Sequence, residues 1–257
     1  MQLTADFHTH TYFSHGKGTI LENALEAKKK GLKQIVITDH CYGHSIYGIK
    51  RKELPLMKRL CEEAEKETGV KVVLGVETNI LGISGKTDMK ERDFEYLEVY
   101  LAGIHKCIMY DRLKEWYLLL ATNFFARHFV KPSESLIKRN TKVYLNTIMK
   151  NPIDILAHPN HAVFCDVVEV AKCCRDYGTY FEIDSRKKHL SDEEWAKVAD
   201  TGVKFIVDSD AHTPDRVGEI GFAEELIKRV GISEDKIYNI NGKMPDYFRF
   251  QEYKQKM

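Results

Sequence analysis

The sequence predicts an α/β fold in which seven parallel strands close, or nearly close, into a barrel. Short runs rich in Val and Ile alternate with longer amphipathic, charged stretches along the 257 residues. Such apolar runs are typical of strands buried in a parallel sheet, and their alternation with helices indicates repeated strand–helix units. The composition, with 43% hydrophobic and 30% charged residues, is that of a globular protein able to bury a full core.

Seven apolar runs are the predicted strands. They lie at residues 2–8, 34–40, 71–77, 99–105, 154–158, 180–184 and 204–210. Each is short and rich in apolar residues, which favours a buried strand over a helix. Seven strands on one chain favour a barrel over an open sheet.

Capping signals mark the helices between these strands. Thr19 and Ser191 each begin a capping box, in which the side chain at the helix start and a Glu three residues later satisfy backbone N–H groups. Gly31 ends the first of these helices. Another helix is predicted from about residue 52 to 68, with Gly69 closing it.

One connection is longer than the others. Nearly fifty residues separate the fourth and fifth predicted strands, which is long for one connection. Residues 131–152 are predicted to be the crossover helix, and residues 113–129 an aromatic-rich helix inserted at about 107–130. The inserted helix could form a lid, pack on the barrel or join two subunits. Nothing suggests a domain boundary, so we expect a single domain over residues 1–257.

The bulk properties argue against several classes of partner. A net charge of +1 gives no overall attraction to nucleic acid, and no apolar run approaches the ~18 residues of a membrane span. The first residues do not resemble a secretory leader. The six cysteines include no Cys-x-x-Cys pair, so we expect reduced thiols and a cytoplasmic protein without a membrane partner.

Every predicted strand ends in at least one residue that could bind a metal ion. In chain order these residues are Asp6, His8, His10, Asp39, His40, Glu77, His105, His158, Glu182, Asp184, Asp208, Asp210 and His212. The C-terminal ends of the strands of a βα barrel form one face, where active sites lie. Imidazole and carboxylate ligands without thiolate suit Zn²⁺, Mn²⁺ or Fe²⁺. So many ligands could hold two or three ions that share a bridging carboxylate.

Six motifs, in this order along the chain, resemble those of the PHP (polymerase and histidinol phosphatase) family. They are DFHTHTYFSHG, ITDH, GVE, GIH, AHP and DSDAH, and the resemblance runs from Asp6 to about Gly218. It is closest to the small stand-alone bacterial PHP phosphatases. The resemblance implies a distorted, seven-stranded, TIM-like (β/α)7 barrel that holds three divalent metal ions.

The resemblance also implies a ligand for each metal ion. It assigns His8, His10 and Asp210 to the first, Glu77 as a bridge to the second, His105 and His158 to the second, and His15, His40 and His212 to the third. The histidines of the first motif would therefore serve two different metal ions.

Three further residues are candidates for a catalytic role: Asp39, His161 and Arg186. Asp39, like Asp6, could accept a hydrogen bond from a ligand imidazole, or it could be a buried carboxylate that caps a loop. Arg186 could bind phosphate through two parallel hydrogen bonds. The other candidate cations are Lys106, Lys187, Lys188 and Arg216. Glu182 and Asp208 are expected to be structural, His44 to lie at the rim of the site, and His128 and His189 at the surface.

The implied activity is metal-dependent hydrolysis of a small phosphomonoester. A metal ion lowers the pKa of bound water from 15.7 to roughly 7, and the resulting hydroxide would attack phosphorus. No G-x-S-x-G or C-x₅-R motif offers a protein nucleophile. The alternatives are a histidinol-phosphate phosphatase, a PHP-type 3′–5′ exonuclease and a non-catalytic metal-binding regulator. The expected partner is a small phosphorylated substrate, and the 113–129 helix could support a homo-oligomer.

Overall fold

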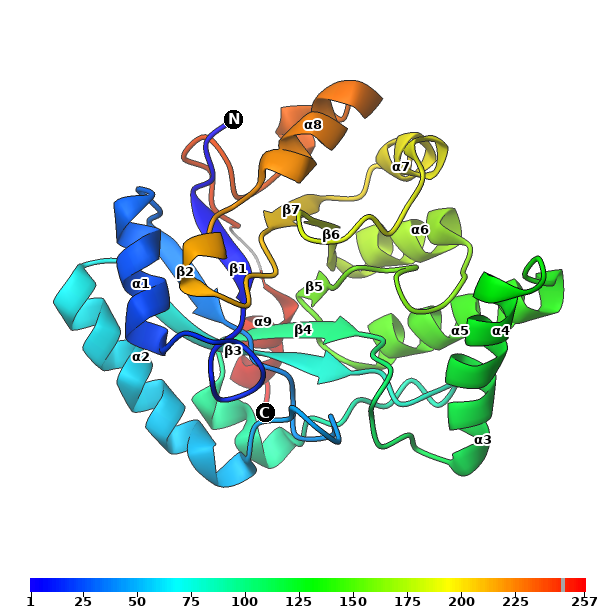
Figure 1. Cartoon of the computed structure of the whole chain (residues 1–257), viewed down its shortest axis with the longest axis horizontal. Coiled ribbons are helices and arrows are strands. Elements are labelled where there is room, and N and C mark those ends of the chain that lie inside the picture. Colours follow the sequence, from blue (N-terminus) through cyan, green and yellow to red (C-terminus); the bar gives the residue numbers. More distant parts are fainter. Residues whose placement is uncertain (246–247) are drawn as a thin grey trace.

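Seven parallel strands form the centre of the molecule and helices surround them (Figure 1). The computed structural model describes residues 1–245 and 248–257. The strands are β1 (Ala5–Thr9), β2 (Gln34–Ile37), β3 (Lys71–Asn79), β4 (Val99–Gly103), β5 (Ile155–Leu156), β6 (Tyr180–Asp184) and β7 (Phe205–Asp208). They pair in chain order, each parallel to the next. All seven predicted strands are present, so the predicted barrel fold is confirmed.

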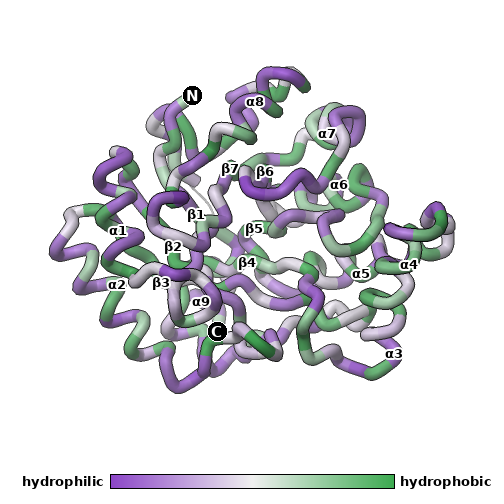
Figure 2. Tube along the Cα trace, viewed as in Figure 1, coloured by the Kyte–Doolittle hydropathy of each residue, from purple (hydrophilic) through white to green (hydrophobic). Residues whose placement is uncertain are grey.

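Helices lie between most of the strands, as predicted, although the connection from β3 to β4 holds only a 3-10 helix, η2 (Glu91–Tyr96). The main helices are α1 (Ile20–Lys29), α2 (Leu54–Thr68), α5 (Glu134–Lys150), α6 (Val167–Tyr177), α7 (Asp192–Ala199), α8 (Gly221–Val230) and α9 (Arg249–Gln255). Both predicted capping boxes form, at Thr19 and at Ser191. Hydrophobic and hydrophilic residues alternate along α1 and α2, which lets each helix bury one face against the strands (Figure 2).

The aromatic-rich stretch at 113–129 is also helical. It consists of α3 (Leu113–Glu115), a π-helical turn η3 (Trp116–Ala121) and α4 (Thr122–His128). This region lies at the edge of the molecule beside α5 (Figure 1), and side chains from η3, α4 and α5 line a cavity of about 620 Å³ between them. None of the helices in residues 1–245 and 248–257 is both long enough and apolar enough to span a bilayer.

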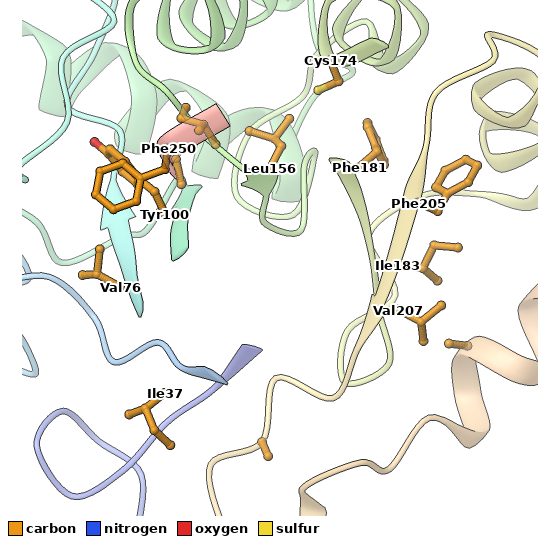
Figure 3. Packing of buried hydrophobic residues seen from close by; sticks show 14 of the residues in the cluster. Ile37, Val76, Tyr100, Leu156, Cys174, Phe181, Ile183, Phe205, Val207 and Phe250 are labelled. Carbon is orange, nitrogen blue, oxygen red and sulfur yellow. The ribbon is translucent and has the colours of Figure 1, made fainter. Parts of the chain in front are cut away.

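The core has two layers. The outer layer fills the space between strands and helices, and Figure 3 shows part of it, including Leu156, Phe181 and Phe205. The ring of Phe250 in α9 packs edge-on against Tyr100 of β4, with 5.4 Å between ring centroids. The inner layer lies within the barrel and consists of Ala5, Phe7, Val36, Val73, Val99, Leu101, Ile155, Tyr180 and Ile206. Because these apolar side chains fill one end of the barrel, the polar side chains occupy the other end.

The barrel closes imperfectly between β1 and β7. Among the described residues, one isolated parallel bridge crosses this seam, between Thr9 of β1 and Ala211, three residues after the end of β7. Farther along the seam, segment 237–240 fills the space, with a parallel bridge to Phe205 of β7 and an antiparallel bridge to Leu3 ahead of β1. The barrel is therefore nearly closed, and the segment after α8 supports its weakest junction.

The side chain of Asn239 replaces some of the backbone hydrogen bonds that would join β1 and β7 in a fully closed barrel. Its Nδ2 donates to the carbonyl oxygens of Ala5 (2.8 Å) and Val207 (2.6 Å), and its Oδ1 accepts from the N–H of Val207 (3.0 Å). Asn239 is fully buried. An Asn side chain suits this position because it carries both donors and an acceptor.

We expect Asn239→Ala to lower the free energy of unfolding by about 2–4 kcal/mol, because it leaves buried backbone groups on both strands without partners. Urea unfolding of the metal-free protein would measure this loss. Asn146→Ala is the control, since the Asn146 amide makes one partly buried hydrogen bond, to the Ile83 carbonyl, and should cost about 1 kcal/mol. Equal losses in the two variants would show that Asn239 does not hold the seam.

Candidate metal centre

The side chain of Glu77 lies at the centre of the polar end of the barrel. Its Oε1 is 2.9 Å from His105 Nε2 and 2.8 Å from His158 Nε2, and its Oε2 is 2.7 Å from His40 Nδ1. β3 continues to Asn79, so Glu77 lies within the strand and is fully buried. One carboxylate therefore faces imidazoles from the ends of β2, β4 and β5.

A second group of ligand atoms crosses the seam between β1 and β7. His10 Nε2 lies 3.2 Å from Asp210 Oδ1 and 3.1 Å from His8 Nε2, and His8 Nε2 lies 3.6 Å from the same Asp210 oxygen. His8 Nε2 is also 3.4 Å from Glu77 Oε2. Ligand atoms of His8, His10 and Asp210 thus come within 4.8 Å of one another, which is the set expected for the first metal ion.

The third group lies nearest the surface. Ligand atoms of His10, His40 and His212 come within 4.8 Å of one another. The ring of His15 stacks parallel to His40 with 4.8 Å between centroids, and its centroid is 4.0 Å from that of His212. The structure therefore brings together the rings of the predicted set His15, His40 and His212. His10 rather than His15 completes the tightest group of ligand atoms.

Several buried ligand-type atoms in this cluster have no hydrogen-bond partner in the described part of the chain. They are His10 Nδ1, His15 Nδ1, His40 Nδ1, His158 Nδ1, Glu77 Oε2 and Asp210 Oδ1. His40 Nδ1 and Glu77 Oε2 approach to 2.7 Å without hydrogen-bond geometry. Buried polar atoms normally have partners. His10 and His158 instead direct Nε2 toward the Asp210 and Glu77 carboxylates. Imidazole nitrogens and carboxylate oxygens that come within 4.8 Å of one another, as these groups do, fit divalent metal ions.

The carboxylates of the cluster are ionised at neutral pH. Burial raises the pKa of Glu77, but neighbouring imidazoles, His105 first among them, bring it well below its usual value. Burial also raises the pKa of Asp210, and the ammonium of Lys187 together with nearby histidines brings it well below the usual range. Both groups are therefore in the form that binds a metal ion.

Most imidazoles of the cluster are neutral at the same pH. Burial is the main cause in each case: it lowers the pKa of His10 and His158 well below the usual value, that of His15 to about 3 and that of His212 to about 4. Nearby cations add to this effect, Arg186 at His15 and His212 and Lys187 at His158. Neutral imidazole is the metal-binding form, so these nitrogens need lose no proton on binding.

Glu182 of β6, expected to be structural, connects two of the candidate ligands. Its Oε1 lies 2.6 Å from His8 Nδ1, and its Oε2 accepts a hydrogen bond from the backbone N–H of His158 at 2.5 Å. Burial lowers the pKa of His8, but the charges of Glu182, Glu77 and Asp210 raise it well above its usual value. A carboxylate on the far nitrogen of a ligand imidazole fixes the ring and makes it a better ligand.

Asn79 has the same relation to another imidazole, and sequence reasoning missed it. Its Oδ1 lies 2.8 Å from His105 Nδ1, so His105 Nε2 is left facing Glu77. The available signal was its position: Asn79 comes two residues after Glu77 in the same strand, and alternate residues of a strand share a face.

Of the two roles considered for Asp6 and Asp39, the structure shows the buried carboxylate that holds a loop and not the hydrogen bond to a ligand imidazole. The Asp39 carboxylate accepts hydrogen bonds from the Thr11 N–H (2.7 Å), the Thr11 hydroxyl (2.6 Å) and the Ser14 hydroxyl. Asp6 accepts from the Ser209 hydroxyl (2.5 Å) and the Gly218 N–H (2.8 Å). Within the described residues neither carboxylate bonds an imidazole. Asp39 instead holds the loop that carries His10 and His15.

Two candidate ligands have left-handed backbone conformations. The φ angles are +29° at His158 and +46° at Asp210, and such values cost non-glycine residues about 1–3 kcal/mol. Gly103 is needed for a different reason, because a Cβ there would lie 2.9 Å from His158 Cε1 and 3.2 Å from Glu77 Oε1. The surrounding structure therefore holds the ligands in a crowded arrangement.

A cavity of about 260 Å³ opens above the cluster. Its lining residues are His15, His40, His44, Tyr47, Ile104, His105, Lys106, Cys107, His161, Ala162, Arg186, Lys187 and His212. His44 thus lies at the rim, as expected, and His161 lines the same cavity with three of the candidate cations, Lys106, Arg186 and Lys187. Lys188 and Arg216 are absent from this wall, and so is Asp39.

Two of the candidate cations, Arg186 and Lys187, form ion pairs with Asp210. Arg186 Nη1 donates to Asp210 Oδ2 at 3.1 Å and lies 3.2 Å from His212 Nε2. Lys187 Nζ is closer, at 2.5 Å from Asp210 Oδ2. The guanidinium and the ammonium therefore lie side by side at the edge of the metal ligands.

The expectation that His189 lies at the surface is wrong. Its side chain is buried, with Nδ1 2.7 Å from the Pro159 carbonyl oxygen and its ring packed edge-on against Trp195. The ring thus joins the loop after β5 to the one after β6. His128, in contrast, is exposed as predicted.

Comparisons with known proteins agree with this geometry. The PHP domain model matches residues 6–223. A probable phosphatase of Thermoanaerobacter sp. strain X514 is 34% identical over 271 aligned residues, covering 99% of this chain and 98% of the relative. A probable phosphatase of Caldanaerobacter subterraneus subsp. tengcongensis is 32% identical and covers 93% and 88%.

A solved structure shares the fold. The histidinol phosphate phosphatase of Lactococcus lactis subsp. lactis Il1403, determined with zinc, L-histidinol and phosphate, superposes with a TM-score of 0.62 at 17% identity, covering 90% of this chain and 94% of the other. The domain match spans well over half of the residues, and it includes every candidate metal ligand. The chain therefore belongs to the PHP family of metal-dependent phosphoesterases.

Proposed function

We propose that this protein hydrolyses a small phosphomonoester at a centre of three divalent metal ions. The observation that carries the proposal is the convergence of imidazole nitrogens and carboxylate oxygens within 4.8 Å of one another around Glu77 and Asp210, where Glu77 Oε2 and Asp210 Oδ1 have no hydrogen-bond partner among the described residues. The nine proposed ligands are His8, His10, His15, His40, Glu77, His105, His158, Asp210 and His212. When bound, such ions supply a hydroxide nucleophile near neutral pH and neutralise charge on the phosphoryl oxygens.

The residues of the cavity wall bind and orient the substrate. Arg186 offers a planar fork for two phosphate oxygens, and Lys187 adds a point charge beside it. Asp210 holds both groups at the edge of the cluster, where the phosphate would lie. Burial, with a contribution from Lys187, lowers the pKa of His161 to about 4. Neutral His161 therefore serves as a hydrogen-bonding group for the substrate.

The size of the cavity supports a small substrate. Its volume of about 260 Å³ lies just below the ~300–1,000 Å³ of typical small-molecule pockets. The metal identity is one of Zn²⁺, Mn²⁺ or Fe²⁺ on the chemistry of the donors, and the Lactococcus phosphatase was solved with zinc. That enzyme's named substrate makes histidinol phosphate the second candidate for this chain.

Phosphate release by Mn²⁺- or Zn²⁺-loaded protein, measured across phosphomonoesters that include histidinol phosphate, tests the proposal. We expect turnover of several compounds and its loss, by at least about a hundredfold, after EDTA treatment, because no protein nucleophile replaces the metal-activated water. Re-adding the metal ion should restore activity. If fully loaded protein released no phosphate from any compound, the catalytic proposal would be wrong.

We also propose that the aromatic face of the inserted helix joins copies of this chain into a homo-oligomer. The face consists of Trp116, Tyr117, Phe124, Phe125 and Phe129, which are 47–68% exposed. At about 150–250 Å² per aromatic side chain, they expose on the order of 500 Å². A stable interface buries about 800 Å² on each partner, and homodimer interfaces are rich in aromatic residues.

Light scattering after size exclusion should give a multiple of the 29.8 kDa chain mass. Phe125→Glu places a charge on the aromatic face, so we expect it to reduce the mass to that of one chain. Leu25→Glu, at an exposed position of α1, should leave the mass unchanged. A single-chain mass for the wild-type protein at about 100 µM would refute the proposed interface.

A further inference from the structure

The wall of the active-site cavity is entirely cationic in its charged side chains. Lys106, Arg186 and Lys187 line it, and no Asp or Glu is found among its described lining residues. The ionised carboxylates of the metal centre, Glu77 and Asp210, lie beneath this wall and are fully buried. A ligand in the cavity therefore meets three positive groups in addition to the metal ions.

These three cations do not have the same role. Arg186 and Lys187 follow β6 and both contact Asp210, so they belong to the position of the reacting phosphate. Lys106 follows β4, directly after His105, and lies on another part of the rim. Within the described residues its ammonium makes no ion pair, and the side chain is exposed. Its charge is available for a ligand.

The surroundings of His161 are positive as well. Arg127 Nη2 donates to the His161 carbonyl oxygen at 2.8 Å, which brings a fourth cation to this part of the rim. After burial, the charges that lower the pKa of His161 come from Lys187, Arg127 and Lys106. The loops after β4 and β5 thus extend the positive region of the cavity beyond Arg186 and Lys187.

We propose that the substrate carries a second anionic group, a carboxylate or another phosphate, and that Lys106 binds it. The inference rests on the proposed phosphatase function. The second group would lie on the part of the substrate that leaves as the alcohol, over the rim formed by Lys106 and His161. A leaving group with positive charge, such as the amine of histidinol phosphate, meets repulsion at the same place. The geometry therefore favours a metabolite with two anionic groups over histidinol phosphate.

A series of two-carbon phosphomonoesters tests this inference directly. Phosphoglycolate, ethyl phosphate and phosphoethanolamine differ at the second carbon by a negative, neutral or positive group, and ethane-1,2-diyl bisphosphate offers a second phosphate. With metal-loaded protein, we expect kcat/KM for one of the two anionic compounds to exceed that for ethyl phosphate about tenfold, the effect of one charge-assisted hydrogen bond. Phosphoethanolamine should fall below ethyl phosphate. Whichever anionic compound is preferred identifies the second group.

Lys106→Gln should remove the preference for the anionic compound by raising its KM. Lys106→Glu should reverse the order, so that phosphoethanolamine becomes a better substrate than the anionic compounds. Lys114→Gln, at an exposed lysine outside the cavity, is the matched control and should keep the wild-type order. Equal kcat/KM values across the series, or a preference that survives in Lys106→Gln, would overturn the inference while leaving the phosphatase function intact.

Binding separates the two proposals if no compound is hydrolysed. In that case the phosphatase function fails. Calorimetric titration of phosphoglycolate and ethyl phosphate into wild-type and Lys106→Gln protein still measures whether Lys106 contributes to anion binding. Tighter binding of phosphoglycolate that depends on Lys106 would support an anion site. Equal affinities for the two compounds would refute it.

Discussion

Glu77→Gln is expected to remove two metal ions from each chain and to lower kcat/KM for phosphomonoesters about a thousandfold. The Glu77 carboxylate approaches imidazoles from three strand ends at 2.7–2.9 Å, and it is fully buried and ionised. A neutral amide has one weak oxygen donor and cannot bridge two cations. A thousandfold change corresponds to ~4 kcal/mol, in the range measured when one partner of a buried charge pair is removed.

Elemental analysis of the purified variant measures the metal content, and phosphate release measures the activity. His128→Asn is the control, because this histidine is exposed and lies outside the cluster. Glu77→Asp keeps the charge on a shorter side chain and should retain some metal. Circular dichroism should show a folded barrel in each variant. Glu77→Gln protein that keeps its full metal content would disprove the bridging role.

Glu182→Gln is expected to weaken metal binding by about 10–100-fold, the usual effect of removing a carboxylate that supports a ligand histidine. The Glu182 carboxylate lies 2.6 Å from His8 Nδ1 and accepts a hydrogen bond from the backbone of His158. Its amide replacement cannot offer two negatively charged oxygens to the two groups. One variant should therefore disturb ligands of two different proposed metal ions.

Competition with a metal-binding dye would give the affinities, and kcat at saturating metal would show whether the assembled centre still works. We expect kcat to recover largely when the metal concentration is raised, since Glu182 touches ligands rather than substrate. Asp192→Asn, which alters an exposed ion pair with Arg229, is the control. An unchanged metal affinity in Glu182→Gln would mean that Glu182 acts only in packing.

The sequence was sufficient to predict the strands and the convergence of the candidate ligands. Parallel strands in a barrel direct their C-terminal ends to one face, so residues such as His8, Glu77 and His158 must approach one another once the strand order is known. Runs such as 71–77 are buried on both sides and carry a clear apolar signal. The capping boxes at Thr19 and Ser191 are local, so they too could be recognised without the fold.

The supporting contacts could not be predicted in the same way, because they depend on which side chains meet across strands. Asp39 is next to His40 in sequence, yet its carboxylate bonds Thr11 and Ser14. His189 lies in a charged stretch, and its burial against Trp195 follows from the path of a loop. The sequence also could not show which cations lie beside the metal ligands. Arg186, Lys187 and Lys188 are adjacent in the sequence, and of these three Arg186 and Lys187 contact Asp210.

We expect metal binding to stabilise the seam between β1 and β7 against local opening. The proposed ligands of the first metal ion lie on both sides of it, with His8 and His10 at the end of β1 and Asp210 after β7. An ion held by both sides binds only the closed form, so its binding free energy is added to the free energy of opening. Amide protons at the seam, including those of Phe7 and His10, should then exchange with solvent at rates set by free metal concentration. The seam would therefore open most readily when the concentration of the free metal ion is low.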